Sequence, residues 1–246
     1  MRAAFLCYTV NIIKPVKGNL TTDMASNDLL LKLILAILPT VLIIVFILAH
    51  DKNKKEPPLL LIILFVLGCL TVIPALYLEI FFEGFLPDIY TAPLIVAFIG
   101  VALPEEFVKY ITAMTVAFNR RSYDEVYDGI IYCVFVSLGF ATVENVMYVL
   151  SFDISTALMR AITSVPAHAM FGVSMGYNMS MAKVRFAKTR YHILAFVSPI
   201  VLHGIYDYIL FSGMEMFLFI FFPFLIWMYI KSIRLVRSTH DLDPFA

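Results

Sequence analysis

The stretch that decides the fold is Leu29–Ala49, which reads LLLKLILAILPTVLIIVFILA. A helix of about 20 mostly apolar residues crosses a hydrocarbon core of roughly 30 Å, and this stretch has that length and character. Similar runs recur along the rest of the chain. The sequence predicts seven spans, at Leu29–Ala49, Pro58–Phe81, Pro93–Phe118, Asp128–Ser151, Thr156–Ala182, Tyr191–Phe211 and Met214–Lys231.

The composition agrees with a membrane protein. The 246 residues are 61% hydrophobic and 15% charged, whereas soluble domains average about 25% charged residues. This excludes an ordinary soluble globular domain. Eighteen basic and eighteen acidic side chains cancel, so no overall basic field exists to attract nucleic acid.

The loops between the predicted spans alternate in charge. Basic loops follow the first, third, fifth and seventh spans, whereas the second and sixth are followed by acidic residues. Lys and Arg are retained on the cytoplasmic side of a membrane, which fixes the direction of every span at once. We therefore expect an all-α, polytopic membrane helix bundle of about seven transmembrane helices, with the N-terminus outside and the C-terminus in the cytoplasm.

No internal repeat or linker divides the chain, which favours a single transmembrane helical domain at 29–231. A short cytoplasmic tail at 232–246 and an N-terminal segment at 1–28 flank it. Residues 1–20 lack the apolar core and cleavage site of a signal peptide. Met24 is an alternative start, in which case the residues before it would be a translation-start artefact, and the sequence leaves both starts open.

Ionisable side chains lie deep in several spans, where each costs about 2.5 to 3.5 kcal/mol on insertion scales and usually serves a function. The set comprises Glu105, Glu106, Lys109, Glu144, His168, His203 and Asp207. Lys32 and Glu79 lie near span ends, and we expect these long side chains to reach the headgroups instead. We expect the same of Arg160, early in the fifth span.

The spacing of the deep polar residues places partners on common helix faces. Lys109 follows Glu105 by four residues, and Asp207 follows His203 by four, so each pair shares a face. Because lipid offers no water, the polar stripes of four helices should converge on one interior cavity. Glu144, His203 and Asp207 fall in the outer half of their spans, which predicts a site that opens toward the extracytoplasmic face.

Glu105 and Glu106 point about 100° apart on a helix, so one should face the cavity while the other reaches a neighbouring helix. The sequence does not say which. Pro104, directly before them, removes a backbone donor and predicts a local opening of the helix.

Three other interpretations stay open on the residues alone. The polar set could be a structural network that ties helices together. It could be the proton relay of a proton-coupled transporter, although no inverted repeat is visible. The chain could also be a non-catalytic membrane scaffold that grips another transmembrane helix through a small-residue face such as Gly172–Gly176.

Four motifs in order carry a resemblance to a known family. They are Glu105-Glu106-Phe-Val-Lys109, Phe140-Ala-Thr-Val-Glu144-Asn145-Val-Met-Tyr148, His168-Ala-Met-Phe-Gly172 and His203-Gly-Ile-Tyr-Asp207. Together they resemble the PrsW family of intramembrane proteases, which is distantly similar to the CAAX prenyl proteases and the bacteriocin-immunity membrane proteins. The motif core covers 93–211.

The resemblance implies that 29–231 is a protease domain and that the protein is an intramembrane endopeptidase. Its substrate would be a membrane-anchored protein, and in the best-known members the reaction is the first cleavage, at site 1, of an anti-sigma factor in a bacterial stress-signalling cascade. The resemblance also implies a bacterial cell membrane as the location. Oligomeric state and regulators are not indicated.

The candidate catalytic residues are Glu105, Glu106, Lys109, Glu144, Asn145, His168, His203 and Asp207. Peptide hydrolysis needs a base for water, a group that stabilises the oxyanion and an acid for the leaving amine. Glu105 or Glu106 is the candidate base, with Lys109 balancing the charge of the pair. His168, His203 and Asn145 are candidates to hold the water or the oxyanion, and Asp207 is placed to orient His203.

A metal-dependent mechanism is the alternative. Two histidines and a carboxylate are ligands that a catalytic divalent metal such as zinc commonly takes. His168, His203 and Glu144, or a member of the Glu105/Glu106 pair, would then be the ligands, and otherwise no cofactor is needed. The H-E-x-x-H motif is absent, so the sequence leaves both mechanisms open.

Overall fold

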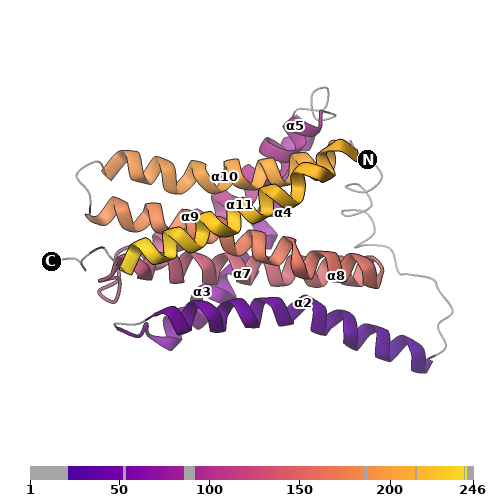
Figure 1. The fold of residues 1–246 in the computed structure, drawn as a ribbon, viewed down its shortest axis with the longest axis horizontal. Helices are drawn as coiled ribbons and strands as arrows, with labels where there is room; N and C mark the ends of the chain where they lie inside the picture. Colours follow the sequence, from indigo (N-terminus) through magenta and orange to yellow (C-terminus); the bar gives the residue numbers. More distant parts are fainter. Residues whose placement is uncertain are drawn as a thin grey trace.

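A computed structural model describes residues 22–51, 54–85, 92–184, 188–213, 215–240 and 242. The predictions about 1–20 lie outside the described residues. The helices are α2 (Thr22–His50), α3 (Pro58–Leu70), α4 (Val72–Phe85), α5 (Pro93–Ile95), the π-helix η1 (Val96–Ala102), α6 (Leu103–Val116), α7 (Val126–Ser151), α8 (Ile154–Ile162), α9 (Ser164–Val184), α10 (Lys188–Phe211) and α11 (Glu215–His240) (Figure 1).

The prediction of an all-helical membrane bundle is confirmed, with fewer uninterrupted spans than expected. Five segments among the described residues are long and apolar enough to cross a membrane. They are Leu29–His50, Pro58–Phe85, Val126–Ser151, Lys188–Phe211 and Phe219–Thr239, and they match the first, second, fourth, sixth and seventh predicted spans.

The second predicted span is interrupted at Thr71, because α3 ends at Leu70 and α4 begins at Val72. The third and fifth predicted spans are also interrupted, and prolines explain these two interruptions. The third consists of α5, η1 and α6 in succession, with the π-helical turns directly before Pro104, where the sequence predicted an opening. The fifth was predicted as one helix, and this is wrong, because α8 ends at Ile162 and α9 begins at Ser164. Pro166 has no N–H to donate to the carbonyl of Ile162, so a continuous helix would lose a hydrogen bond there.

The start of α8 is fixed by a cap. The side chain of Asp153 accepts a hydrogen bond from the backbone N of Thr156 at 3.0 Å. The hydroxyls of Ser155 and Thr156 donate to the same carboxylate oxygen. Together these donors stabilise the carboxylate and hold the pKa of Asp153 below its usual range.

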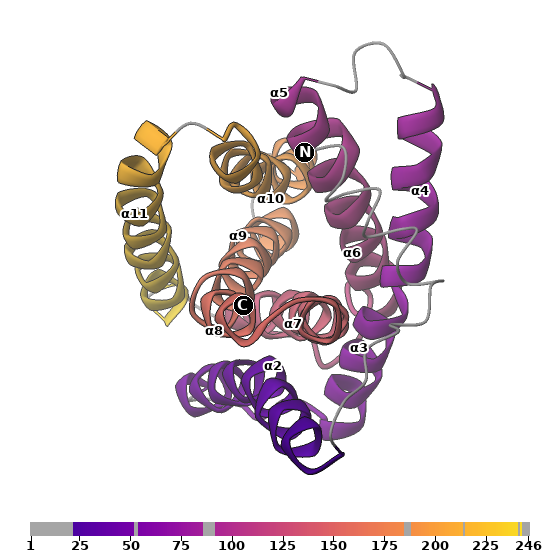
Figure 2. The same ribbon diagram turned by 90° about the vertical axis from the view of Figure 1, so that its right-hand side faces the viewer.

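Helices α7 and α9 form the centre of the bundle, and α2, α3, α6, α10 and α11 surround them (Figure 2). Glycines allow the close approach. A Cβ on Gly139 would overlap the carbonyl oxygen of Phe65 in α3, and a Cβ on Gly176 would overlap that of Gly129 in α7. The small-residue face of α9 is therefore covered by α7 of the same chain, which contradicts its use as a grip for another protein's helix.

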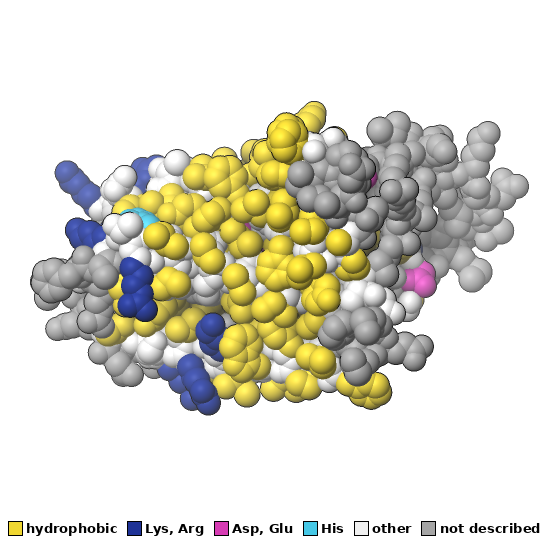
Figure 3. Space-filling view, turned by 90° about the horizontal axis from the view of Figure 1, so that it is seen from above, with side chains coloured by type: hydrophobic (Ala, Val, Ile, Leu, Met, Phe, Trp, Pro, Cys, Tyr) yellow, Lys and Arg dark blue, Asp and Glu magenta, His cyan; other side chains and the backbone are white. Residues whose placement is uncertain are grey.

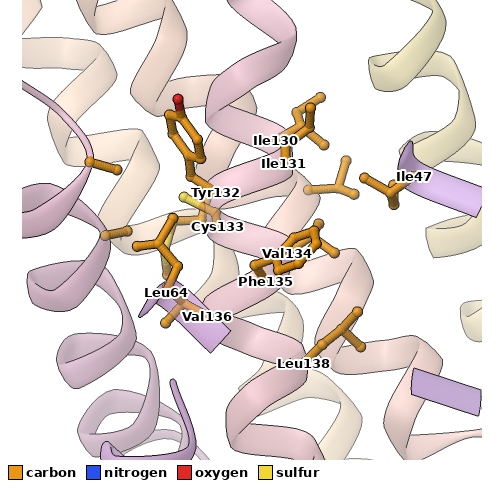
Figure 4. Packing of buried hydrophobic residues seen from close by; sticks show 14 of the residues in the cluster. Ile47, Leu64, Ile130, Ile131, Tyr132, Cys133, Val134, Phe135, Val136 and Leu138 are labelled. Atoms are coloured by element: carbon orange, nitrogen blue, oxygen red, sulfur yellow. The ribbon is translucent and has the colours of Figure 1, made fainter. Parts of the chain in front are cut away.

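The central helix α7 contributes more buried residues to the largest apolar cluster than any other helix that the structure describes. Ile130, Ile131, Val134 and Leu138 are fully buried around it, and Leu64 of α3 and Ile47 of α2 pack nearby (Figure 4). This cluster fixes α7 relative to its neighbours and so fixes the side chains that α7 contributes to the polar interior.

The basic loops meet at one end of the bundle. Lys54, before α3, pairs with Asp124, before α7, and Lys183 near the end of α9 donates to the carbonyl of Tyr123 at 3.1 Å. On the face shown in Figure 3, Lys and Arg side chains gather toward this end while hydrophobic side chains cover the middle. The alternation of loop charge thus corresponds to two chemically different ends of the bundle.

Candidate active site

Lys109 lies at the centre of a buried polar cluster between α6 and α9. Its Nζ is 3.1 Å from Oε2 of Glu105 and 2.8 Å from Oε1 of Glu106. A third contact, of 3.3 Å, joins Nζ to Nδ1 of His168 in α9. The Lys109 side chain is fully buried. An ammonium buried in this way needs anionic partners, and the two adjacent glutamates of the first turn of α6 supply them.

The contacts of His168 fix its tautomer. An ammonium group only donates hydrogen bonds, so Nδ1 accepts from Lys109 and Nε2 carries the proton. Nε2 then donates to Oε2 of Glu144 in α7 at 2.9 Å. The same carboxylate oxygen is 3.0 Å from the guanidinium of Arg160 in α8. A chain of contacts thus runs from α6 through α9 and α7 to α8.

His203 in α10 lies between two carboxylates. Its Nδ1 is 3.0 Å from Oε1 of Glu106, and its Nε2 is 3.3 Å from Oδ2 of Asp207 one turn later. The ring of Phe171 stacks on the imidazole, with centroids 4.8 Å apart. Glu106 and Asp207 therefore hold the plane and the position of this ring from both edges.

A cavity of about 90 Å³ opens beside the cluster. One ordered water needs roughly 10–15 Å³ on this measure, so the cavity has room for water and for a peptide group. Glu105 lines the cavity, and Glu106 does not. The two glutamates therefore divide as their positions on the helix predicted, with Glu105 toward the cavity and Glu106 toward α10. The other acidic and basic lining residues among those that the structure describes are Glu79, Glu144, Arg160, His168, His203 and Asp207.

Two expectations about charged residues near span ends are wrong. Arg160 was expected at the outer headgroups, yet it lines the cavity and pairs with Glu144. Glu79 was also expected to reach the headgroups, yet its side chain is 7% exposed and lines the same cavity. Val72 and Leu76 lie on the same face of α4 as Glu79 and also line the cavity.

Asn145 occupies a different place from the other motif residues. Its Oδ1 accepts a hydrogen bond from Nε of Arg160 at 3.0 Å, and its Nδ2 donates to the carbonyl of Ala36 at 3.3 Å. It is fully buried and does not line the cavity. Its contacts suit a residue that positions Arg160.

Four residues fit a metal ion by the chemistry of their donors. Ligand atoms of Glu105, Glu106, His168 and His203 all lie within 4.8 Å of one another. Oε2 of Glu106 is buried and has no hydrogen-bond partner among the residues that the structure describes. Two imidazoles and carboxylates are a common donor set for catalytic zinc. Glu144, the third ligand considered from the sequence, is not part of this group. Its carboxylate contacts Nε2 of His168 instead.

Comparisons with known proteins identify the family. A family model described as PrsW family intramembrane metalloprotease matches residues 56–230. A protein named Protease PrsW from Geobacillus kaustophilus is 37% identical over 173 residues, which cover 70% of this chain and 76% of that protein. Its namesake from Oceanobacillus iheyensis is 36% identical over 207 residues, covering 83% and 94% of the two chains.

The Protease PrsW of Bacillus subtilis is 29% identical over 209 residues, covering 84% of this chain and 94% of that protein. No solved structure matches this chain. The family model spans more than half of the chain and includes all four motifs, so the resemblance seen in the sequence is confirmed. The chain belongs to the PrsW family of intramembrane metalloproteases and is a multi-pass membrane peptidase.

Proposed function

We propose that this peptidase hydrolyses its substrate in the cavity beside Lys109, with Glu105 as the base that activates water. The observation that carries the proposal is the division of the two adjacent glutamates, because Glu105 lines the cavity and Glu106 does not. Lys109 contacts both and offsets their charge. A base must lie within hydrogen-bond reach of the water it activates, and Glu105 is the member of the pair that meets this condition.

The remaining residues would hold the reacting groups in place. His168 and His203 line the cavity and are the candidates to hold the water and the oxyanion. Asp207 positions His203 from one turn away, and Glu144 positions His168 through its Nε2 proton. The role of Asn145 would be indirect, through its bond to Arg160.

Glu105, Glu106, His168 and His203 would hold a divalent metal ion such as zinc. Such an ion would supply Lewis-acid chemistry, polarising the scissile carbonyl and making a bound water more nucleophilic. Lys109 contacts three of these four residues. Its ammonium would therefore lie beside a bound ion or would have to move away from these residues when the ion binds.

The proposed substrate is a membrane-anchored protein with a single span, cut near the outer end of that span, as in the first cleavage of an anti-sigma factor. Two features support this. The cavity residues lie late in α7 and α10 and early in α9, toward the end of the bundle opposite the basic loops. The basic end would be cytoplasmic, with the N-terminus outside and the C-terminus inside, in a bacterial cell membrane.

The test is cleavage of a single-span reporter in proteoliposomes, by the wild type and by Glu105→Gln and Glu106→Gln. Loss of a general base typically costs about 10²- to 10⁴-fold, so Glu105→Gln should lower kcat by that factor. Glu83→Gln is the matched control, since Glu83 lies on α4 and does not line the cavity. Wild-type kcat in Glu105→Gln would remove Glu105 from the role of base.

A zinc chelator added to the same reactions separates the two mechanisms. If the chelator stops wild-type cleavage and zinc restores it, the four-residue group holds a metal. If cleavage continues unchanged, the glutamate and water act without one.

A further inference from the structure

Glu79 is a buried carboxyl that the mechanism above does not use. It comes from α4, is 7% exposed and lines the same cavity as Glu105 and Glu144. Within the described part of the chain it has neither a hydrogen bond nor an ion pair. Both carboxyl oxygens of Glu79 are therefore available to a substrate in the cavity that Glu105 also lines.

The basic groups beside the cavity already have acceptors for their protons. Three acceptors, two carboxylates and one imidazole nitrogen, meet the three N–H bonds of Lys109. The protonated nitrogen of His168 is 2.9 Å from a carboxylate oxygen. Both ring nitrogens of His203 face carboxylates, at 3.0 and 3.3 Å. A proton taken from any of these groups would leave a buried carboxylate without its donor, which is costly.

The surroundings of Glu79 favour a carboxyl that holds its proton. Its neighbours along the helix face are Val72 and Leu76, which are apolar. A carboxylate in such a position has lost its hydration without gaining a cation or a donor in return. A neutral carboxylic acid avoids that cost and can also donate a proton.

We propose that Glu79 is the catalytic acid that protonates the leaving amine. This inference rests on the proposed function, in which Glu105 takes a proton from water and hydroxide adds to the scissile carbonyl. When the tetrahedral intermediate collapses, the C=O bond re-forms, the C–N bond breaks, and its electron pair takes the proton of Glu79. The proton held by Glu105 then returns to Glu79 through cavity water, so the cycle closes with one water consumed.

The experiment compares a peptide bond with an ester at the same position of the reporter. The scissile bond is first mapped by mass spectrometry of the wild-type products in proteoliposomes, and a second reporter then carries an ester there. An alkoxide leaves far more readily than an unprotonated amine, so loss of the acid should slow peptide cleavage much more than ester cleavage. We expect Glu79→Gln to lower kcat on the peptide by about 10²-fold or more and on the ester by less than about tenfold.

Matched variants keep the result interpretable. Glu105→Gln should lose activity on both reporters, since both reactions need the activated water. Glu83→Gln, at the next turn of α4, should resemble the wild type on both. The ester-to-peptide ratio is measured on one preparation, so it does not depend on how much of the Glu79→Gln protein is folded. Glu79→Asp, which keeps an acid on a shorter side chain, should recover part of the peptide cleavage.

Two results would overturn the assignment. An equal loss on both reporters in Glu79→Gln would make Glu79 a structural residue, and wild-type peptide cleavage would remove it from the reaction. Failure of the proposed function gives a different pattern, in which Glu105→Gln remains active on both reporters.

Discussion

Arg160 contacts three residues of the site from α8, a helix that carries none of the four motifs. Its guanidinium contacts Glu144 at 3.0 Å and Asn145 at 3.0 Å, and it lies 3.6 Å over the ring of Tyr148. Glu144 in turn accepts the Nε2 proton of His168. Arg160 therefore fixes the orientation of an imidazole on another helix, through a planar side chain that meets several partners at once.

We expect Arg160→Gln to lower kcat about 10- to 100-fold, the range typical of residues that orient the groups in direct contact with the reaction. Arg160→Lys keeps the charge but not the planar fork, so it should recover only part of the loss. Cleavage of the single-span reporter in proteoliposomes measures both. Lys32→Gln is the control, since Lys32 does not line the cavity and donates to the carbonyl of Phe152. A wild-type kcat in Arg160→Gln would show that Glu144 holds His168 unaided.

The motif residues could be found from sequence because intramembrane charge is rare and their i, i+4 spacing puts them on common faces. Glu79 and Arg160 were misplaced because the distance of a residue from a span end was taken as its depth. Helix α4 extends to Phe85, four residues beyond the predicted end, so Glu79 lies deeper than expected. The partners of Arg160 are on α7, and contacts between helices cannot be read from spacing along one of them.

Interruptions of helices were harder to predict than the helices themselves. Hydropathy identified the five spans that are long and apolar enough to cross a membrane, because long apolar runs have few other stable conformations in lipid. It did not separate α8 from α9, since Thr163 does not interrupt the apolar run. The break matters for the site, because α8 carries Arg160 and α9 carries His168. Two helices can orient these side chains independently, which one straight helix could not.

Close packing of α7 against α3 and α9 depends on glycines at the crossing points. A methyl group on Gly139 would overlap the carbonyl of Phe65, and one on Gly176 would overlap that of Gly129. We expect Gly139→Ala and Gly176→Ala each to destabilise the fold by about 1–3 kcal/mol, the usual cost of overpacking. Thermal unfolding in detergent micelles would measure the effect.

Gly84 of α4 provides the control for these substitutions. No atom lies within 4 Å of the position that its Cβ would take, so Gly84→Ala should be neutral or slightly stabilising, as alanine favours a helix. Equal midpoints for the Gly139, Gly176 and Gly84 variants would mean that α7 tolerates wider spacing than the structure shows.

At the scale of the whole molecule, the two ends of the bundle differ in charge and in distance from the site. The basic loops join at one end through contacts such as Lys183 with Tyr123. The cavity lies toward the other end, near the cap of α8 at Asp153. An orientation with the basic end in the cytoplasm therefore places the cavity nearer the outer surface of the membrane, where the span of a substrate would emerge.

This orientation predicts which loops a reagent outside the cell can reach. Arg121 and Ser155 are both exposed, and they lie at opposite ends of the bundle. In a background whose three cysteines are replaced by alanine, Ser155→Cys should react with a membrane-impermeant maleimide on intact cells, whereas Arg121→Cys should react only after the cells are opened. The alanine background without a new cysteine gives the unlabelled baseline. Labelling of Arg121→Cys but not Ser155→Cys on intact cells would show that the bundle has the opposite orientation, with the cavity toward the cytoplasm. The proposed cut near the outer end of a substrate's span would then fail, while the chemistry assigned to Glu105 would stand.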